Sequence, residues 1–475
     1  MEQINAKQIE EWLEAHRAEM VEDIFRIVRI PSVSDAASPA KPYGQPCRDV
    51  LDEMLNIARE HGFHTRNFDY QCGCMWLGEE EIDLSDAIAF WGHLDVVPAS
   101  GEWNFSPFDP FERNGFLVGR GVDDNKGPAV AAMYVIRCLH ELGVSLTHPL
   151  CLFVGCDEEV GMRDLEYYTK NHPCPRLSIV SDCGFPVCYA EKGIIEANLI
   201  SEPLSDEILS LSGGLASNIV PDQAEICLKK SERVINQLSM LPHELKYDEQ
   251  ADEVRITAHG VAAHTAFPEG GVNAIAQLAK GLVYANLLSD EDAGVLQFFC
   301  EATQDFYGRG LRIMQEDDLS GKLTCVGSVC SLDDQHRARL HFNIRYPVKA
   351  DSDAIIKQIA KIAELHGFSF ELIRDSKPND FPKEHPAVDY LTDLFNRVTG
   401  SDTKPYVMGG GTYARKLPRA FAFGPGMPES GLDRDMFPEG HGSAHGPDEA
   451  LNLSNLLTAM KIYCLGIPEV DRMEL

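Results

Sequence analysis

Apolar residues in the first part of the chain alternate between helical and strand-like spacing. They recur at helical spacing from Ile9 to Val28, and Pro31 predicts the end of that helix. The runs that follow predict, in order, a strand over 87–97, a helix over 127–142, a strand over 150–154, a helix over 163–170 and a strand over 179–180. Alternating strands and helices predict an α/β layer with a mostly parallel sheet.

From about Glu191 the pattern changes to helical runs that are each followed by strand-like runs. The predicted helices cover 272–288 and 353–366, and the predicted strands cover 323–329, 337–346 and 368–373. This order predicts α+β units with antiparallel strands, and the repetition favours two copies of one unit. The α/β pattern returns after 377–382 and ends in a helix with an apolar face from Leu453 to Cys464.

These changes predict two domains, and a chain of 475 residues is too long for one ordinary core. The first domain is discontinuous and comprises residues 1–190 and 385–475. The second, residues 191–384, is inserted into it. The expected fold is therefore an α/β domain, with a mostly parallel sheet flanked by helices, interrupted by an α+β domain.

The charge of the chain limits its partners. The formal net charge is −32, so a nucleic acid would be repelled. We interpret this negative charge as a feature that keeps the protein soluble. The alternative is a weak attraction for cationic substrates. Hydrophobic residues make up 44% of the chain, which is enough for substantial cores.

Cysteine use and hydropathy predict the compartment. The 14 cysteines follow no repeating spacing, which favours free buried thiols in a reducing cytosol. The first 20 residues are charged and lack the apolar core of a signal peptide. No segment has the long uncharged run of a membrane span. We therefore expect a cytoplasmic protein that does not enter a membrane.

Candidate metal ligands occur where predicted strands end, which is where open α/β sheets place their sites. His93 and Asp95 are two positions apart, so on a strand both face the same side. His93 can bind a metal through one ring nitrogen while Asp95 holds the other. A lone His-x-Asp is far more often an unrelated pair, so this motif gains weight only beside the others.

Asp124 follows a glycine-rich turn and precedes a predicted helix. A carboxylate on a tight turn can be shared by two cations, one on each oxygen, and the neighbouring Asp123 competes for this role. The same residues also suit a simple turn with a helix N-cap.

Asp157, Glu158 and Glu159 follow another predicted strand. One carboxylate can bind a cation while its neighbour takes a proton from activated water and gives it to a leaving amine. A solvated acidic turn is the commoner meaning of such a run. Asp182, after the next strand, and His445, before the last helix, add two ligand candidates.

Further candidates lie outside this cluster. His264, Asn218 and Arg345 belong to the inserted domain and would serve catalysis only if that domain closes over the site, and Arg345 also suits a structural salt bridge. Gly411, the last of three glycines, and Thr412 offer backbone N–H groups and a hydroxyl suited to a carboxylate. The spacing of a phosphate loop is absent there.

In their order, these motifs resemble the co-catalytic zinc metallopeptidase family that includes acetylornithine deacetylase, succinyl-diaminopimelate desuccinylase, carboxypeptidase G, carnosinase and peptidase V. The motifs span nearly the whole chain. They are Gly92-His93-Leu94-Asp95-Val96-Val97-Pro98, Gly119-Arg120-Gly121 through Asp124-Asn125-Lys126-Gly127-Pro128, Asp157-Glu158-Glu159, Ala263-His264-Thr265 and His445-Gly446-Pro447-Asp448-Glu449.

The resemblance implies a role for each candidate. It implies that His93 and Asp182 bind one metal, that Glu159 and His445 bind the other, and that Asp124 bridges both. It implies that Glu158 is the general acid and base, that Asp95 clamps His93, and that the Asp124–Asn125 peptide is cis. Asn125 and Ser181 depart from the residues common in relatives, which affects no proposed ligand.

The surroundings of Asn218 and Arg345, and the long insertion, look most like peptidase V. The resemblance therefore implies a ferredoxin-like, duplicated lid that imitates within one chain the pairing of dimeric relatives, so a monomer is expected. His264 would stabilise the oxyanion, and Asn218, Arg345, Gly411 and Thr412 would hold substrate oxygens.

We therefore expect a dinuclear metallodipeptidase for short peptides with a free amino terminus. The two ions are expected to be Zn²⁺, with Mn²⁺ or Co²⁺ as alternatives. One rival function is an N-acyl amino acid deacylase of the same fold. Another is an inactive metal-binding or interaction protein, against which the presence of Glu158 and Asp95 argues, because metal ligation alone does not require them.

Overall fold

The computed structural model describes residues 5–429 and 431–474. It divides into two compact units, and each is described by itself. Unit 1 comprises Met1–Ala190, Asn379–Tyr406 and Thr412–Leu475, and unit 2 comprises Glu191–Pro378 and Val407–Gly411. The chain thus returns to the first unit at Asn379, six positions before the start expected at 385, because Asn379 and Asp380 already form a strand of its sheet.

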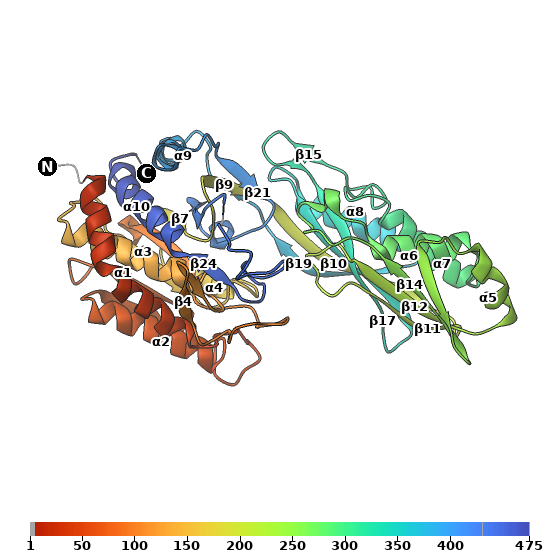
Figure 1. Ribbon diagram of the computed structural model, residues 1–475. Helices are drawn as coiled ribbons and strands as arrows, with labels where there is room; N and C mark the ends of the chain where they lie inside the picture. Colours follow the sequence, from red (N-terminus) through yellow and green to blue (C-terminus); the bar gives the residue numbers. More distant parts are fainter. Residues whose placement is uncertain (1–4, 430, 475) are drawn as a thin grey trace. The chain divides into compact units, whose positions relative to one another are not determined.

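The sheet of unit 1 has a parallel centre and antiparallel flanks (Figure 1). In spatial order its strands are β1 (His64–Phe68), β2 (Cys72–Trp76), β6 (Leu150–Gly155), β3 (Ile88–His93), β7 (Leu177–Val180), β22 (Ala420–Phe423), β9 (Val187–Glu191) and β20 (Asn379–Asp380), with β21 (Tyr406–Met408) paired to β9. The strands β6, β3, β7 and β22 are parallel neighbours. This confirms the α/β class of the unit, with the parallel strands at the centre of its sheet.

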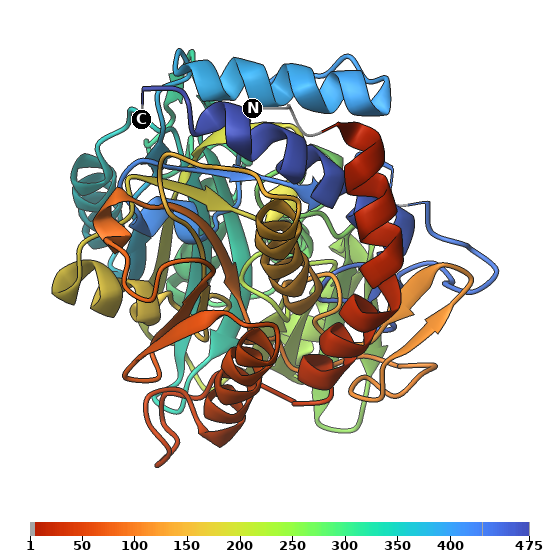
Figure 2. The ribbon, with the colours of Figure 1, turned by 90° about the vertical axis from the view of Figure 1, so that its left-hand side faces the viewer.

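Helices pack on this sheet and on one another (Figure 2). They are α1 (Ala6–Val28), α2 (Gln45–Glu60), α3 (Lys126–Glu141), α4 (Arg163–Asn171), α9 (Pro386–Thr399) and α10 (Leu453–Val470). The Ala-rich α3 lies on β3 and β6 and is covered by α1 and α10. It is buried along nearly its whole length, which explains why its sequence lacks a polar face.

Two differences from the sequence-based elements concern the ends of elements. The strand expected over 87–97 ends at His93, so His93 and Asp95 do not share a strand face. The helix expected over 272–288 ends at Tyr284, and the chain turns there so that Leu287 and Leu288 enter the core from a loop. In both cases a continuous apolar run includes buried loop residues, which periodicity does not separate from the element.

A smaller antiparallel ladder in unit 1 joins distant parts of the chain. It contains β4 (Phe111–Arg113), β5 (Phe116–Val118) and β24 (Ala450–Asn452), and Val118 is paired with Ala450. Phe116, Val118, Phe437 and Ala450 form its apolar cluster. The ladder therefore brings the segments just after Val118 and just before Ala450 together.

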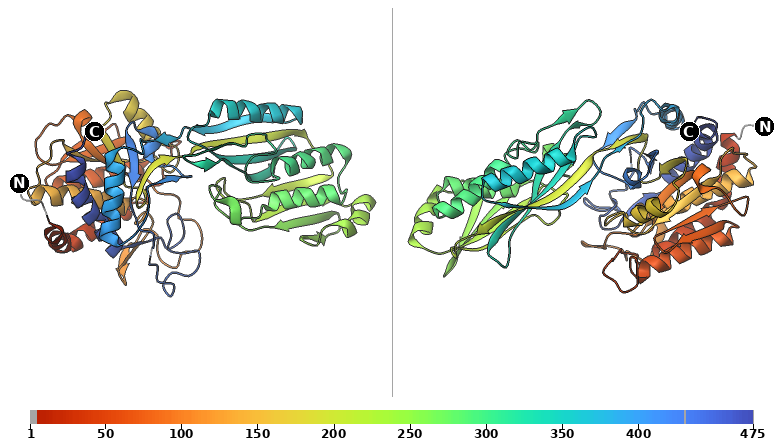
Figure 3. Two further views of the ribbon diagram at one scale, coloured as in Figure 1. Left: turned by 90° about the horizontal axis from the view of Figure 1, so that it is seen from above. Right: turned by 180° about the vertical axis from the view of Figure 1, so that it is seen from behind.

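Unit 2 is one antiparallel sheet with α6, α7 and α8 along one face (Figure 3). Its strands in spatial order are β13 (Leu245–Glu249), β14 (Glu253–His259), β12 (Gln223–Lys229), β11 (Ile208–Gly213), β17 (Thr324–Leu332), β18 (Arg337–Tyr346), β10 (Gly193–Pro203) and β19 (Ser369–Ser376). Its helices are α5 (Glu232–Gln237), α6 (Ala274–Tyr284), α7 (Asp290–Ala302) and α8 (Ser352–Leu365). Short ladders elsewhere pair β15 (Glu316–Asp317) with β16 (Gly321–Lys322), and β8 (Cys183–Gly184) with β23 (Pro425–Gly426).

Strand β18 shows how the sequence builds the unit 2 sheet. Its alternate residues Ala338, Leu340, Phe342, Ile344 and Tyr346 enter the apolar core with the helices. The residues between them, among them Asn343 and Arg345, lie on the opposite face and are polar. Among the described residues, none of the helices is long and apolar enough to cross a membrane.

Candidate metal centre

The candidate site lies at the carboxyl end of the parallel strands in unit 1. His93 ends β3 directly opposite Gly155, the last residue of the neighbouring strand β6. Asp182 follows β7, the other neighbour of β3. Because parallel strands point the same way, the loops after them meet at one edge of the sheet.

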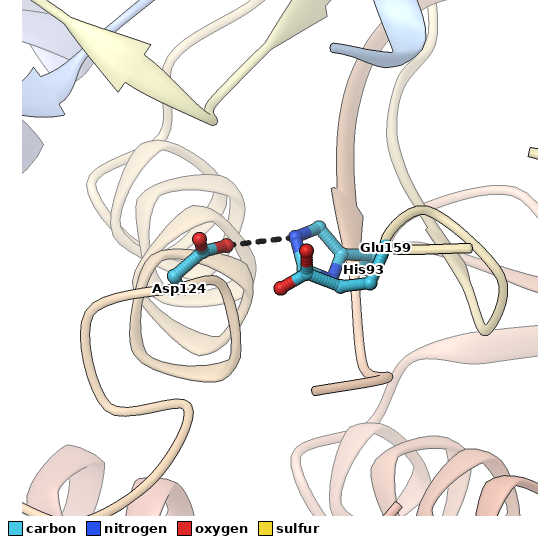
Figure 4. A group of neighbouring side chains, drawn as sticks. All are labelled: His93, Asp124 and Glu159. Carbon is cyan, nitrogen blue, oxygen red and sulfur yellow. Dashed lines mark hydrogen bonds and ion pairs between the residues drawn. The ribbon is translucent and has the colours of Figure 1, made fainter. Parts of the chain in front are cut away.

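His93, Asp124, Glu159 and His445 form a connected cluster. His93 Nε2 lies 2.9 Å from Asp124 Oδ1, and His445 Nε2 lies 2.9 Å from Asp124 Oδ2. His445 Nε2 also lies 3.0 Å from Glu159 Oε1. Figure 4 shows Asp124 and Glu159 directed toward the ring of His93. The carboxylate of Asp124 thus stands between the two histidines, with one oxygen on each.

A second group shares the same histidine. Potential ligand atoms of His93, Glu158 and Asp182 lie within 4.8 Å of one another, as do those of His93, Asp124 and Glu159. His93 Nε2 lies 3.7 Å from Asp182 Oδ2. The structure therefore brings all five ligand candidates and Glu158 together.

Asp95 lies beside His93 and also contacts the turn that carries the two glutamates. His93 Nδ1 is 3.0 Å from the backbone oxygen of Asp95 and 3.4 Å from its carboxylate. The buried carboxylate of Asp95 accepts hydrogen bonds from the backbone N–H groups of Glu158 (3.2 Å) and Glu159 (3.1 Å). It therefore holds the turn that presents the two glutamates.

The three neighbouring acidic residues have separate surroundings. The Asp157 side chain turns away and accepts hydrogen bonds from Ser34 and from the guanidinium and backbone of Arg163. Glu158 and Glu159 point into the cluster. The acidic run by itself did not separate Asp157 from the two glutamates, because the partners of Asp157 are Arg163, six positions later, and Ser34, 123 positions earlier.

Asn125 is a contributor for which the sequence assigned no role. The Asp124–Asn125 peptide is cis, as expected from the family resemblance. Asn125 Nδ2 donates to Ser181 O (2.7 Å) and to Asp182 Oδ1 (3.0 Å), and its Oδ1 accepts from the backbone N–H of His93 (3.3 Å). It therefore ties together the strand ends that carry His93 and Asp182.

Arg120 and Glu449 also escaped assignment, although both stand inside the quoted motifs. They form a buried ion pair with a separation of 2.6 Å, and Glu449 accepts hydrogen bonds from the turn that carries Asp124. The sequence shows only that an Arg and a Glu stand within the metal-ligand motifs, and their burial and pairing are seen only in the structure.

The electrostatics of the cluster fit a cation. Burial would raise the pKa of Asp124, but hydrogen bonds from His445 and His93 outweigh it and lower that pKa. Hydrogen bonds to Asp124 and Glu159 raise the pKa of His445 to about 11. Burial, with the charges of Asp182 and Glu159, raises the pKa of Glu158 well above its ordinary range. Buried carboxylates in such excess need protons or cations to balance them.

The chemistry of these donors fits divalent metal ions. Carboxylate oxygens and imidazole nitrogens are ligands of Zn²⁺, and this combination also suits Mn²⁺ and Co²⁺. The two groups of ligand candidates share His93, and Asp124 lies between His93 and His445. Together they have enough donor atoms for two neighbouring ions.

The remaining candidates lie mostly in unit 2. The backbone N–H of Thr265 donates to Asn218 O (2.9 Å), so the loops of His264 and Asn218 are neighbours. Thr265 Oγ1 and Arg345 Nε both lie within 3.0 Å of Asn343 Oδ1, at 3.0 Å and 2.9 Å. Asn218, His264 and Arg345 are thus joined through one polar network of unit 2.

His264 has a defined tautomer. Its Nδ1 accepts a hydrogen bond from the backbone N–H of Ala266 at 3.2 Å, so the proton of the neutral ring is on Nε2. Burial and the charge of Arg345 lower the pKa of His264, which favours this neutral ring. His264 therefore offers one N–H donor.

Gly411 and Thr412 fall on either side of the division between the units. The Thr412 hydroxyl oxygen accepts from the backbone N–H of Ala414 at 3.1 Å and caps the short helix Tyr413–Lys416. A structural role of Thr412 is thus evident in unit 1.

An α/β unit with a histidine and carboxylate cluster at the carboxyl end of its parallel strands has the site that a metal-dependent hydrolase needs. The model of Peptidase family M20/M25/M40 matches residues 89–467, and the chain belongs to this family. It is a metallopeptidase-family enzyme, as the order of motifs implied.

Two curated relatives match over nearly their whole length. The Bacillus subtilis (strain 168) protein named "Putative dipeptidase YtjP" is 32% identical, with 96% of this chain and 98% of the relative covered. A protein of Staphylococcus epidermidis named "Putative dipeptidase" is 30% identical, with 94% and 95% covered.

Solved structures share the fold. The di-peptidase Dug1p of Saccharomyces cerevisiae matches with a TM-score of 0.60 and 14% identity, covering 99% of both chains. Human carnosine dipeptidase 1 matches with a TM-score of 0.57 and 14% identity, covering 99% of this chain and 100% of its own. The fold expected from the sequence, an α/β domain with an inserted α+β domain, is confirmed.

Proposed function

We propose that this protein hydrolyses the peptide bond of dipeptides or short peptides with a free amino terminus, using two divalent metal ions. The observation that carries the proposal is the meeting of His93, Asp124 and Glu159 with His445, Asp182 and Glu158 at one end of the sheet. Membership of the peptidase family and relatives named as dipeptidases support the substrate class.

His93 and Asp182 would hold one ion, Glu159 and His445 the other, and Asp124 would bridge them. We propose Zn²⁺ as the natural ion, with Mn²⁺ or Co²⁺ able to replace it. When bound, such ions activate water toward attack and polarise the scissile carbonyl.

Glu158 would move the proton. It is the carboxylate of the cluster that the proposed ligand set does not use, and burial raises its pKa above that of an ordinary glutamate, which is the direction that a carboxyl group acting as both acid and base requires. It would take a proton from the attacking water and deliver it to the amine that leaves. Asp95 holds Glu158 in place through the backbone.

We further propose that the Nε2–H group of His264 donates a hydrogen bond to the oxyanion, and that Asn218, Arg345, Gly411 and Thr412 hold substrate oxygens. The neutral ring of His264 with its proton on Nε2 supports this role, because an oxyanion needs a donor that is already oriented. The network through Asn343 would hold Arg345 and the His264 loop together.

The experiment compares a dipeptide with its N-acetylated form, using chain freed of metal and then supplied with Zn²⁺, Mn²⁺ or Co²⁺. We expect metal-dependent cleavage of the free dipeptide and little cleavage of the blocked one. Preference for the blocked substrate would identify an N-acyl amino acid deacylase instead. Absence of cleavage of every dipeptide and tripeptide with metal bound would leave a metal-binding protein without this activity.

We also propose a cytoplasmic monomer whose partner is a small peptide, and neither a nucleic acid nor a membrane. None of the 14 cysteines forms a disulfide in the described part of the chain, which suits a reducing compartment. Light scattering of the purified protein would measure the mass, and twice the mass of one chain would overturn the monomer.

A further inference from the structure

Two segments that carry proposed metal ligands meet at one buried carboxylate, that of Glu449. Its Oε1 accepts backbone N–H hydrogen bonds from Gly121 (3.0 Å), Asp123 (2.9 Å) and Asp124 (3.1 Å). Three donors on a single oxygen orient the turn from which the Asp124 side chain projects. Glu449 itself follows His445 by four positions and is fully buried.

Arg120 completes the arrangement from the other side. Its Nη1 donates to Glu449 Oε2 at 2.6 Å, and its Nη2 donates to the backbone oxygen of His445 at 3.2 Å. The guanidinium lies 5.0 Å from the ring centre of Trp103, and the side chain is 1% exposed. One guanidinium thus binds both the carboxylate that holds the Asp124 turn and the loop that presents His445.

The adjoining ladder explains how residues more than 300 positions apart meet. Val118 in β5 pairs with Ala450 in β24, and the backbone N–H of Gly119 donates to Glu449 O at 2.9 Å. Gly121 then turns the chain with φ 89°, and a Cβ there would approach Val96 Cγ1 to 2.7 Å. The end of the ladder therefore fixes where Asp124 and His445 stand relative to each other.

We propose that Arg120 and Glu449 are positioning residues that set the separation of Asp124 and His445, and so the affinity for the ion shared by Asp124, Glu159 and His445. The inference rests on the proposed function, because it assigns those three residues as ligands. A fully buried ion pair is weak evidence for stability, since desolvation offsets much of its attraction. Its hydrogen bonds to the segments of two ligands give it a role in orienting them.

The test measures Zn²⁺ binding, with no substrate present, by competition with a chromophoric chelator. The variants are Glu449→Gln, Arg120→Lys and the control Asp23→Asn. Asp23 is also a buried carboxylate of unit 1. Its hydrogen-bond and ion-pair partners among the described residues are Arg26, His61 and Tyr134, none of which is a proposed ligand. Unfolding temperatures of the metal-free variants report the loss of stability separately from the loss of affinity.

We expect the wild type and Asp23→Asn to bind two equivalents with the same affinities. In Glu449→Gln the affinity for one of the two equivalents should fall by about 10- to 100-fold, and excess Zn²⁺ should restore its occupancy. Arg120→Lys, which keeps the charge but cannot serve both acceptors, should lose affinity in the same direction. If Glu449→Gln does not fold, the Zn²⁺ affinity of Arg120→Lys tests the inference instead.

Unchanged affinity for both equivalents in a folded Glu449→Gln or Arg120→Lys protein would overturn the inference. So would an equal loss in Asp23→Asn, because the effect would then follow from lowered stability alone. A wild type that fails to bind two equivalents would instead overturn the proposed function, so the two failures are distinguishable.

Discussion

His93 and Asp95 meet through the backbone: His93 Nδ1 lies 3.0 Å from the carbonyl oxygen of Asp95, closer than the 3.4 Å to its carboxylate. The carboxylate is thereby available to accept the backbone N–H groups of Glu158 and Glu159. Asp95, which was expected to orient His93, thus also orients the turn that carries Glu158 and Glu159.

Asp95→Asn should lower kcat by about 10- to 100-fold. Asparagine keeps one acceptor but turns its NH₂ toward a backbone N–H, so a hydrogen bond to a charged acceptor worth about 1.5–3 kcal/mol is lost. The control is Asp471→Asn, because the buried Asp471 also accepts from two successive backbone N–H groups, those of Thr147 and His148, at the other end of β6. It should lose stability by chemical denaturation but keep kcat; equal kcat losses in both would contradict the specific role.

Glu158→Gln should retain both metal ions and lose at least about 100-fold in kcat, because the amide cannot accept a proton from water. Metal content by mass spectrometry and turnover of a dipeptide measure the two effects. Glu166→Gln, which removes a carboxylate paired with Lys416 on the surface, is the control and should retain turnover. A Glu158→Gln enzyme with normal kcat would exclude the proposed proton transfer.

Asn125→Leu should weaken metal binding as well as folding. The variant loses donation to Ser181 O and Asp182 Oδ1 and leaves the backbone N–H of His93 without this acceptor. Each buried group left unsatisfied costs about 1–3 kcal/mol. Asn125→Asp keeps the acceptor for the backbone N–H of His93, so its Zn²⁺ affinity should lie between those of the wild type and Asn125→Leu. An Asn125→Leu protein that binds Zn²⁺ like the wild type would contradict this view.

Gly155→Ala and Gly294→Ala should change stability in opposite directions. A Cβ at Gly155 would lie 2.0 Å from Tyr413 Oη and 2.3 Å from Asp164 Oδ2. The Tyr413 hydroxyl donates a hydrogen bond to this Asp164 oxygen, so the Cβ would collide with both partners. Overpacking of this kind costs about 1–3 kcal/mol or more. Gly294 lies in α7 with no atom near the added Cβ, so alanine should stabilise by about 0.5–1 kcal/mol. Thermal unfolding measures both, and a stabilised Gly155→Ala would contradict the packing seen here.

Metal binding should release protons and become weaker as the pH falls. Burial lowers the pKa of His93, but its hydrogen bond to Asp124 and the charge of Asp182 outweigh this and raise that pKa well above its ordinary value. The metal-free ring therefore holds its proton to a higher pH than an ordinary histidine does, and it must lose that proton to bind an ion. Calorimetric titrations with Zn²⁺ in two buffers of different ionisation enthalpy count the released protons. Net proton uptake would contradict the assignment of His93.

Removal of the ions should lower the unfolding temperature. An ion that binds only the folded chain stabilises it by about 2.7 kcal/mol at a concentration 100 times its Kd. Unfolding with a chelator present and with Zn²⁺ present measures this difference. Equal transitions would mean that the cluster binds no ion in the folded state.

The local pattern of the chain determined most of the elements around the site. The spacing of apolar residues predicted α1 and the Ala-rich α3 in unit 1 and strand β18 in unit 2, because helical and strand periodicity are properties of neighbouring residues. The order of the motifs also identified His93, Asp124 and Glu159 as candidates, which the structure brings together.

The partners of these candidates were decided only by the tertiary structure. The sequence shows three neighbouring carboxylates of the same chemistry. In the structure Asp157 accepts hydrogen bonds from Arg163 and Ser34, whereas Glu158 and Glu159 enter the cluster. Glu449 and Arg120 are 329 positions apart in the chain, and the pairing of β24 with β5 brings them together. The physical reason is that burial and hydrogen bonding between distant segments depend on how strands pair, and strand pairing is not encoded in the spacing of neighbours.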